Sequence, residues 1–145
     1  MNPNEMLRKR SVEVVPAEIG RLQEFFNDLA ETMSAKAGLG LAAPQVGIIK
    51  RIIAIQAAKG AEIYINPKIV AKSFFKERDE EGCLSIPGVY GIVRRWRKIK
   101  VEALNRQGKQ LKFTARGLMA RILQHEIDHL DGILFIDKAE EIFNS

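Results

Sequence analysis

The segment His125-Glu126-Ile127-Asp128-His129 combines residue types that can hold and use a metal ion. Residues four apart lie on the same face of a helix, so both imidazoles could reach one ion. Glu126, rotated by about 100° on such a helix, could flank a water beside that ion. This H-E-x-x-H pattern predicts a metal-dependent hydrolytic site. The alternative interpretation is two hydrogen-bonded core histidines beside a solvated carboxylate.

Cys83 is the only cysteine of the chain and offers a third soft ligand. A catalytic zinc-type site uses three protein ligands and leaves a position for water, whereas a structural site uses four. Cys83, His125 and His129 are therefore enough for an open site. By itself a single cysteine is more often a small buried hydrophobe, so its interpretation as a ligand depends on the histidines. A single cysteine also excludes an internal disulfide, which fits a reducing compartment.

Two helices are expected from the spacing of apolar residues. From Gly117 to Leu130 apolar residues cover two adjacent faces, which predicts a core helix carrying the histidines and ending at Gly132. Residues 16–36 carry a narrower apolar stripe, typical of an amphipathic N-terminal helix. Its members are Ile19, Leu22, Phe26, Leu29 and Met33.

The remaining segments predict strands. We expect strands at residues 51–56, 62–66 and 68–75, and a hairpin around a turn at residues 105–109. The acidic run at residues 77–81 is expected to be a solvated loop. Because strands and helices do not alternate, the order favours an α+β fold, with mainly antiparallel sheets packed around the H-E-x-x-H helix.

Length and composition describe an ordinary globular chain. It has 145 residues, 46% hydrophobic and 28% charged, so we expect one folded domain over residues 1–145. The most apolar stretch, residues 38–49, is broken by Pro44 and is shorter than the ~18 residues of a membrane span. The N-terminus has no apolar core of a secretory signal, so a cytoplasmic location is expected.

The net charge of +5 favours encounter with polyanions but does not define chemistry. Arg94-Arg95-Trp96-Arg97-Lys98 is the one cluster that mixes basic and aromatic residues. It is interpreted either as a solvated strand end or as a contact for RNA through charge and stacking.

Three motifs together resemble the bacterial peptide deformylases, a family with the ordered motifs G-x-G-x-A-A-x-Q, E-G-C-L-S and Q-H-E-x-D-H. All three are complete here, and the resemblance runs from about residue 7 to residue 137, most of the chain. The matching segments are Gly38-Leu39-Gly40-Leu41-Ala42-Ala43-Pro44-Gln45, Glu81-Gly82-Cys83-Leu84-Ser85 and Gln124-His125-Glu126-Ile127-Asp128-His129.

The resemblance implies an activity and roles for individual residues. The expected reaction removes the formyl group from the N-terminal formyl-methionine of nascent polypeptides and releases formate. Cys83, His125 and His129 would hold one divalent metal ion, commonly Fe(II) in the cell, although such a site also accepts Zn, Ni or Co. Glu126 would be the general base, and the Gln45 amide and the Leu84 backbone N–H would stabilise the oxyanion.

The resemblance also implies how the substrate would lie. Gly38, Leu39 and Gly40 would accept its backbone as an added strand. Leu118 and Ile122, with His125, would surround its methionine side chain, and Arg95 would help to line the site. We expect a monomer with no membrane partner and no specific nucleic acid.

Longer relatives continue into a C-terminal helix that some use on the ribosome, whereas this chain stops at Ser145. Residues 139–143 could form a short helical stub, and the positive charge could support weak ribosome association.

Two other functional classes compete with this interpretation. A metallopeptidase could use the same H-E-x-x-H helix to cut internal peptide bonds, but Cys83 and Gln45 argue against it. A non-catalytic metal-binding or RNA-binding module is the other class. Glu126 argues against that module, since a structural site needs no general base.

Overall fold

The computed structural model describes residues 3–144. It contains two mainly antiparallel sheets and a few helices, which confirms the α+β class. The helical elements are α1 (Pro3–Leu7), the 3₁₀ segments η1 (Pro16–Leu22) and η2 (Ala43–Val46), α2 (Gln23–Ala35), α3 (Gly117–Leu130) and α4 (Phe135–Lys138). The strands are β1 (Gly40–Ala42), β2 (Ile52–Ala57), β3 (Gly60–Lys72), β4 (Lys76–Cys83), β5 (Ile86–Trp96), β6 (Lys98–Leu104), β7 (Gln110–Arg116) and β8 (Ala139–Asn144).

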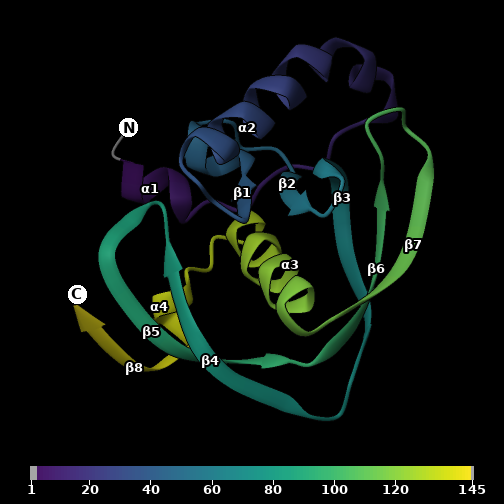
Figure 1. Ribbon diagram of the computed structural model, residues 1–145. Coiled ribbons are helices and arrows are strands. Elements are labelled where there is room, and N and C mark those ends of the chain that lie inside the picture. The colour runs from purple at the N-terminus through teal and green to yellow at the C-terminus, as the bar shows by residue number, and fades with distance from the viewer. Residues whose placement is uncertain (1–2, 145) are drawn as a thin grey trace.

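The larger sheet has the strand order β1-β2-β3-β6-β7 and the smaller one the order β4-β5-β8. Figure 1 shows α3 between the two sheets, with α2 on the outer side of the larger sheet. Strand β2 is apolar without interruption because its alternate residues face opposite layers. Ile52 and Ala54 pack in the cluster that includes Phe26 and Met33 of α2 and its neighbours. Ile53 and Ile55 pack toward α3.

Helix α3 is therefore a buried helix, as its apolar pattern predicts. Leu123, Ile127 and Leu130 pack against the larger sheet. The helix ends where Gly132 adopts a positive φ of 75°, which a side chain would make costly. In the described residues no helix is long and apolar enough to cross a membrane.

The expected N-terminal helix is divided into two parts. Residues Pro16–Leu22 form a 3₁₀ segment, and the α-helix begins only at Gln23. Gly20 lies in the first part and lowers its α-helical propensity. The apolar stripe is kept, because Ile19, Phe26 and Met33 all lie in one core cluster.

Two expectations about local structure are wrong, one of a loop and one of a helix. The acidic run at residues 77–81 is part of β4, which pairs with β5 along its whole length. The stub expected at residues 139–143 is not a helix but strand β8, which pairs with the other side of β5. Both errors have the same cause: β5 is a long strand in the centre of the small sheet, and pairing with it overrides weak local propensity.

Candidate metal centre

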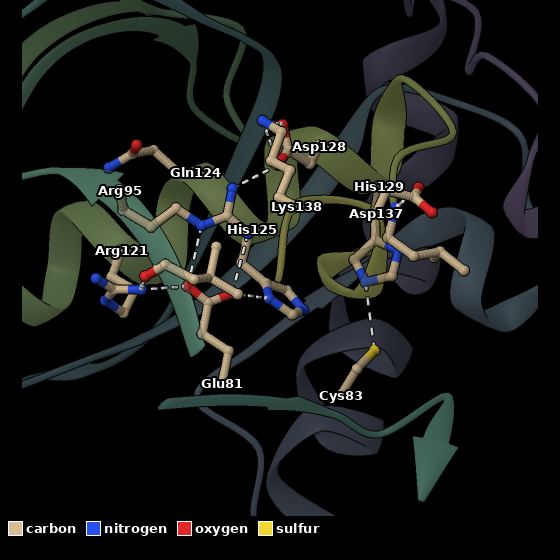
Figure 2. A network of polar contacts seen from close by, with 12 residues as sticks. Glu81, Cys83, Arg95, Arg121, Gln124, His125, Asp128, His129, Asp137 and Lys138 are labelled. Carbon is tan, nitrogen blue, oxygen red and sulfur yellow. Dashed lines mark hydrogen bonds and ion pairs between the residues drawn. The ribbon is translucent and has the colours of Figure 1, made fainter. Parts of the chain in front are cut away.

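The two histidines of α3 and the cysteine at the end of β4 converge at one point. The ligand atoms of Cys83, His125 and His129 all lie within 4.8 Å of one another. Cys83 Sγ is 3.4 Å from His129 Nε2. Figure 2 shows Cys83 facing His129 from the neighbouring strand. A thiolate and two imidazoles at this spacing match the donor set of an open transition-metal site.

Glu81 fixes the orientation of the first imidazole. Its Oε1 atom is 2.9 Å from His125 Nδ1, which leaves Nε2 of that ring for a ligand. Burial raises the pKa of Glu81, but the bonds from His125 and Arg95 outweigh this and lower it to about 2. Glu81 is thus a buried anion behind the histidine.

Two arginines hold Glu81 in place, as Figure 2 shows. Arg95 donates to it twice, from Nε and Nη2, both at 2.9 Å. Arg121 donates to Oε2 at 2.6 Å and to the carbonyls of Val93 at 2.9 Å and Glu77 at 2.7 Å. A buried carboxylate bonded in this way costs little to keep ionised and cannot easily rotate.

The pKa values of the histidines differ because their surroundings differ. Burial lowers the pKa of His129 to about 3, and the charges of His125 and Arg95 act in the same direction. Burial also lowers that of His125, but Cys83, Glu81 and Glu126 together raise it to about 10. The negative groups around His125 thus favour a bound cation. A metal ion at this place would take the position of the proton on the His125 ring.

Glu126 points into the same space without a protein partner. Among the described residues its Oε1 atom is buried and has no hydrogen bond. Burial raises its pKa to about 7. A buried, unpartnered carboxylate oxygen beside three soft ligands fits a site that also holds water. The residues present therefore fit a divalent ion with an open position.

Gln45 reaches the centre from η2. Its Oε1 atom accepts a hydrogen bond from the Ala42 backbone N–H at 2.8 Å. This bond turns its Nε2 atom toward Ser85 Oγ at 3.0 Å and Cys83 Sγ at 3.6 Å. The side-chain amide is thus a fixed donor at the edge of the metal centre.

A pocket of about 490 Å³ opens beside these groups. It is lined by most of the residues expected from the sequence: Gly38, Leu39, Gly40, Gln45, Cys83, Leu84, Leu118, Ile122, His125 and Glu126. Leu118 is 62% exposed at its rim. Strand β1, which carries Gly40, is an edge strand of the larger sheet.

The structure does not bring Arg95 to this pocket. Its side chain is only 3% exposed and its donors are used by Glu81 and by Asp128, at 2.5 Å. Arg95 lies behind the histidines, so it supports the centre instead of lining it.

Sequence reasoning missed Glu81 and Arg121 as members of the site. Two spacings could have identified them. Glu81 lies only two residues before Cys83, close enough in the chain for its carboxylate to reach the same site. Arg121 lies four residues before His125 on the helix, so both can reach one partner.

A buried helix that presents two histidines and a glutamate to a cysteine across an open pocket defines a metal-dependent hydrolase. The comparisons with known proteins are specific about the family. The family model described as polypeptide deformylase matches residues 1–144. A peptide deformylase of Desulfitobacterium hafniense is 47% identical over 141 residues, 95% of this chain and 91% of that protein.

A peptide deformylase of Natranaerobius thermophilus is also 47% identical, over 98% of this chain and 91% of its own length. The crystal structure of the enzyme from Thermotoga maritima superposes with a TM-score of 0.91 at 37% identity, over 97% of this chain and 95% of that one. The chain belongs to the polypeptide deformylase family. Its members are metal-dependent hydrolases that remove the N-formyl group from nascent peptides.

Proposed function

We propose that Cys83, His125 and His129 hold one divalent ion, Fe(II) in the cell, and that Glu126 is the general base. The observation that carries this assignment is the unpartnered Oε1 atom of Glu126 beside the three ligands. An ion held there supplies a Lewis acid and lowers the pKa of water. The reaction takes place in the cytoplasm, and the protein acts as a monomer.

Glu126 carries the proton through the reaction. It accepts a proton from the water that attacks the formyl carbon, and the water oxygen forms the new bond to carbon. The C–N bond then breaks, and Glu126 returns the proton to the leaving amine. The products are formate and a peptide with a free N-terminal amine.

Gln45 and Leu84 stabilise the negative charge that develops on the formyl oxygen. The bond from Ala42 orients the Gln45 amide, and the N–H that it directs toward Cys83 Sγ, with Nε2 3.6 Å away, would be the donor to the formyl oxygen. The Leu84 backbone N–H belongs to the turn between β4 and β5, directly after Cys83, and would be the second donor.

The peptide lies along the free edge of β1. Gly38, Leu39 and Gly40 line the pocket on this edge, and an edge strand offers backbone groups for an added strand. Leu118 and Ile122 line the pocket and form the apolar surface for the methionine side chain. Arg95, whose position excludes it from that surface, holds Glu81 and so orients His125.

The substitution Glu126→Gln tests the assignment of the base, because it keeps the shape of the side chain. We expect kcat to fall by about 10²-fold or more. Metal content, measured by elemental analysis, and the visible spectrum of the cobalt-loaded protein should be unchanged, because Glu126 is not a ligand. A Glu126→Gln protein that retains kcat within a factor of three would contradict the proposal.

A further inference from the structure

A second surface lies outside the metal pocket and combines exposed aromatic and basic side chains. We call it the basic-aromatic face and define it as Lys72, Phe74, Phe75, Lys76, Glu77, Trp96, Arg97, Lys98 and Arg116. It is formed by the connector between β3 and β4 and by the adjoining ends of β5, β6 and β7. The deformylase reaction uses none of these residues.

The two phenylalanines of this face are unusually exposed. Phe74 is 92% exposed and Phe75 is 66% exposed, and their rings contact edge to face with centroids 5.2 Å apart. Two adjacent aromatic side chains in water forgo a large gain from burial. Exposed apolar groups with a polar rim are typical of an interaction site.

Hydrogen bonds fix this exposure. Ser73 N–H donates to the Lys98 carbonyl at 2.9 Å, and Ser73 Oγ donates to the Phe75 carbonyl at 3.0 Å. The Arg97 N–H donates to the same Phe75 carbonyl at 3.2 Å. The connector is thus tied to the start of β6, and both rings are held outward instead of folding onto the core.

The surplus charge of the chain is concentrated on the same face. Its five basic residues and Glu77 give a net charge of +4, whereas the net charge of the whole chain is +5. The rest of the sequence is therefore nearly balanced, with 18 basic and 17 acidic residues. Of the five basic residues, only Arg97 has an ion pair within the described residues, with Glu77 at 2.7 Å.

Trp96 connects the charges to the aromatic groups. The ammonium groups of Lys72 and Lys76 lie 4.2 and 4.1 Å from the centre of its ring. Next to it, Phe75, Arg97 and Arg116 line a shallow groove that also reaches Gly117, the first residue of α3. Leu118, the next residue, lines the substrate pocket. The groove and the pocket are therefore neighbours at the start of α3.

We propose that the basic-aromatic face binds single-stranded RNA without sequence specificity. Cations along a groove neutralise successive phosphates, and an exposed aromatic face accepts an unpaired base of any kind. A membrane surface fits less well, because binding to lipid scales with the apolar area that is buried. This face offers only two strongly exposed apolar side chains, Phe74 and Phe75, and it also carries the acidic Glu77. Nascent peptides leave a particle whose surface is rich in RNA, so such contact would bring the pocket close to its substrate.

The test measures binding of a fluorescein-labelled 12-nucleotide single-stranded RNA to the nickel-loaded full chain by anisotropy. With up to four phosphates neutralised, a plot of log Kd against log salt should have a slope of about 2.8. Trp96 is the only tryptophan, so its emission should change as RNA saturates the protein. A duplex RNA of the same length should bind more weakly, because its bases cannot stack on the phenylalanines.

Matched variants separate this face from general basicity. Phe74→Ser with Phe75→Ser should weaken binding by about fivefold or more, whereas Val12→Ser, at a residue that is 66% exposed elsewhere, should not. Lys72→Glu with Lys98→Glu should weaken it further and flatten the salt slope. Lys9→Glu with Lys109→Glu changes the net charge equally at exposed sites away from the face and should have a much smaller effect. Formate release by every variant shows that the fold is kept.

Four results would overturn the proposal: no RNA binding at low salt, unchanged Trp96 emission at saturation, equal affinity for duplex RNA, or equal losses from the two pairs of charge reversals. Binding of phosphatidylglycerol vesicles with no binding of RNA would instead assign the face to lipid. Because none of these readouts uses the metal centre, failure here leaves the assignment of the active site unaffected.

Discussion

Replacing Gly40 by alanine should misplace the general base while leaving the ligands untouched. A Cβ atom at Gly40 would lie 2.7 Å from Glu126 Oε2 and 2.8 Å from its Cγ. Ordinary contact begins near 3.4 Å, so Glu126 would have to retreat by about 0.7 Å. Because Glu126 lines the pocket, the displaced carboxylate would move away from β1, out of the position it takes beside the three ligands.

The expected loss follows from this displacement. A general base contributes on the order of 10²–10⁴ in rate, and an error of about 1 Å in its position can remove about 10²-fold. We therefore expect Gly40→Ala to lower kcat for a formylated tripeptide by about 10²-fold. The free energy of unfolding should fall by only about 1–3 kcal/mol, as for a modest overpacking, and metal content should not change.

The assay is formate release by the nickel-loaded protein, with two other glycines for comparison. At Gly38 the close atom is the terminal Cδ1 of Leu84, 2.8 Å away on a side chain that is 37% exposed and can rotate, so Gly38→Ala should lose less activity. At Gly20 nothing lies within 4 Å, so Gly20→Ala should keep full activity. A Gly40→Ala protein with kcat within threefold of the parent would refute the placement of Glu126 against β1.

Three further predictions concern the metal and the surface. Arg121→Met should weaken metal binding, measured by competition with a chelator, by about tenfold. It should also lower the free energy of unfolding by about 2–3 kcal/mol. The control Arg78→Met, at a side chain that is 53% exposed, should change neither quantity. Unchanged metal affinity in Arg121→Met would show that Arg121 does not support His125 through Glu81. The iron form should lose activity in air faster than the nickel form, because an Fe(II) site with a thiolate ligand is oxidisable, and equal half-lives would argue against Fe(II) as the sensitive species. The Arg8 side chain beside Asp137 lowers the pKa of the Asp137 carboxyl. The pair therefore stabilises the fold above the pKa that this carboxyl has in the unfolded chain, near 3.9. This stabilisation disappears as the pH falls through the lowered pKa of the folded state. Asp137→Asn should therefore lower stability at pH 7 by less than about 1 kcal/mol. This deficit should shrink as the pH falls below the unfolded pKa, and an equal deficit at pH 7 and at low pH, measured by denaturation, would contradict the pairing.

Periodicity and motif spacing predicted much of the fold and its chemistry. The apolar pattern of α3 and the positions of β2, β6 and β7 follow local rules that the tertiary structure leaves intact. The spacing of His125 and His129 is set by one helix, so it could be read directly from the sequence. Their convergence with Cys83, from a distant strand, could be expected only because the ordered motifs resemble a known family.

The failures come from residues whose partners are distant in the sequence. Strand β4 carries exposed charged residues, and its strand conformation depends on pairing with β5. The basic residues around Arg95 in the sequence suggest a surface cation. The alternation of side chains along β5 instead directs Arg95 inward, where it contacts Glu81. No local pattern shows that a buried carboxylate 14 residues away will neutralise it. The exposure of Phe74 and Phe75 is equally invisible in the sequence, where aromatic pairs usually indicate core.

The most direct test of the central claim is formate release from an N-formyl-methionyl tripeptide, using protein loaded anaerobically with Fe(II). Metal-free protein and Cys83→Ala, which lacks one proposed ligand, are the comparisons. The account predicts release that requires the metal, is lost in both comparisons, and does not occur with the N-acetylated peptide. Cleavage of an internal peptide bond in place of formate release, or full activity in Cys83→Ala, would contradict it.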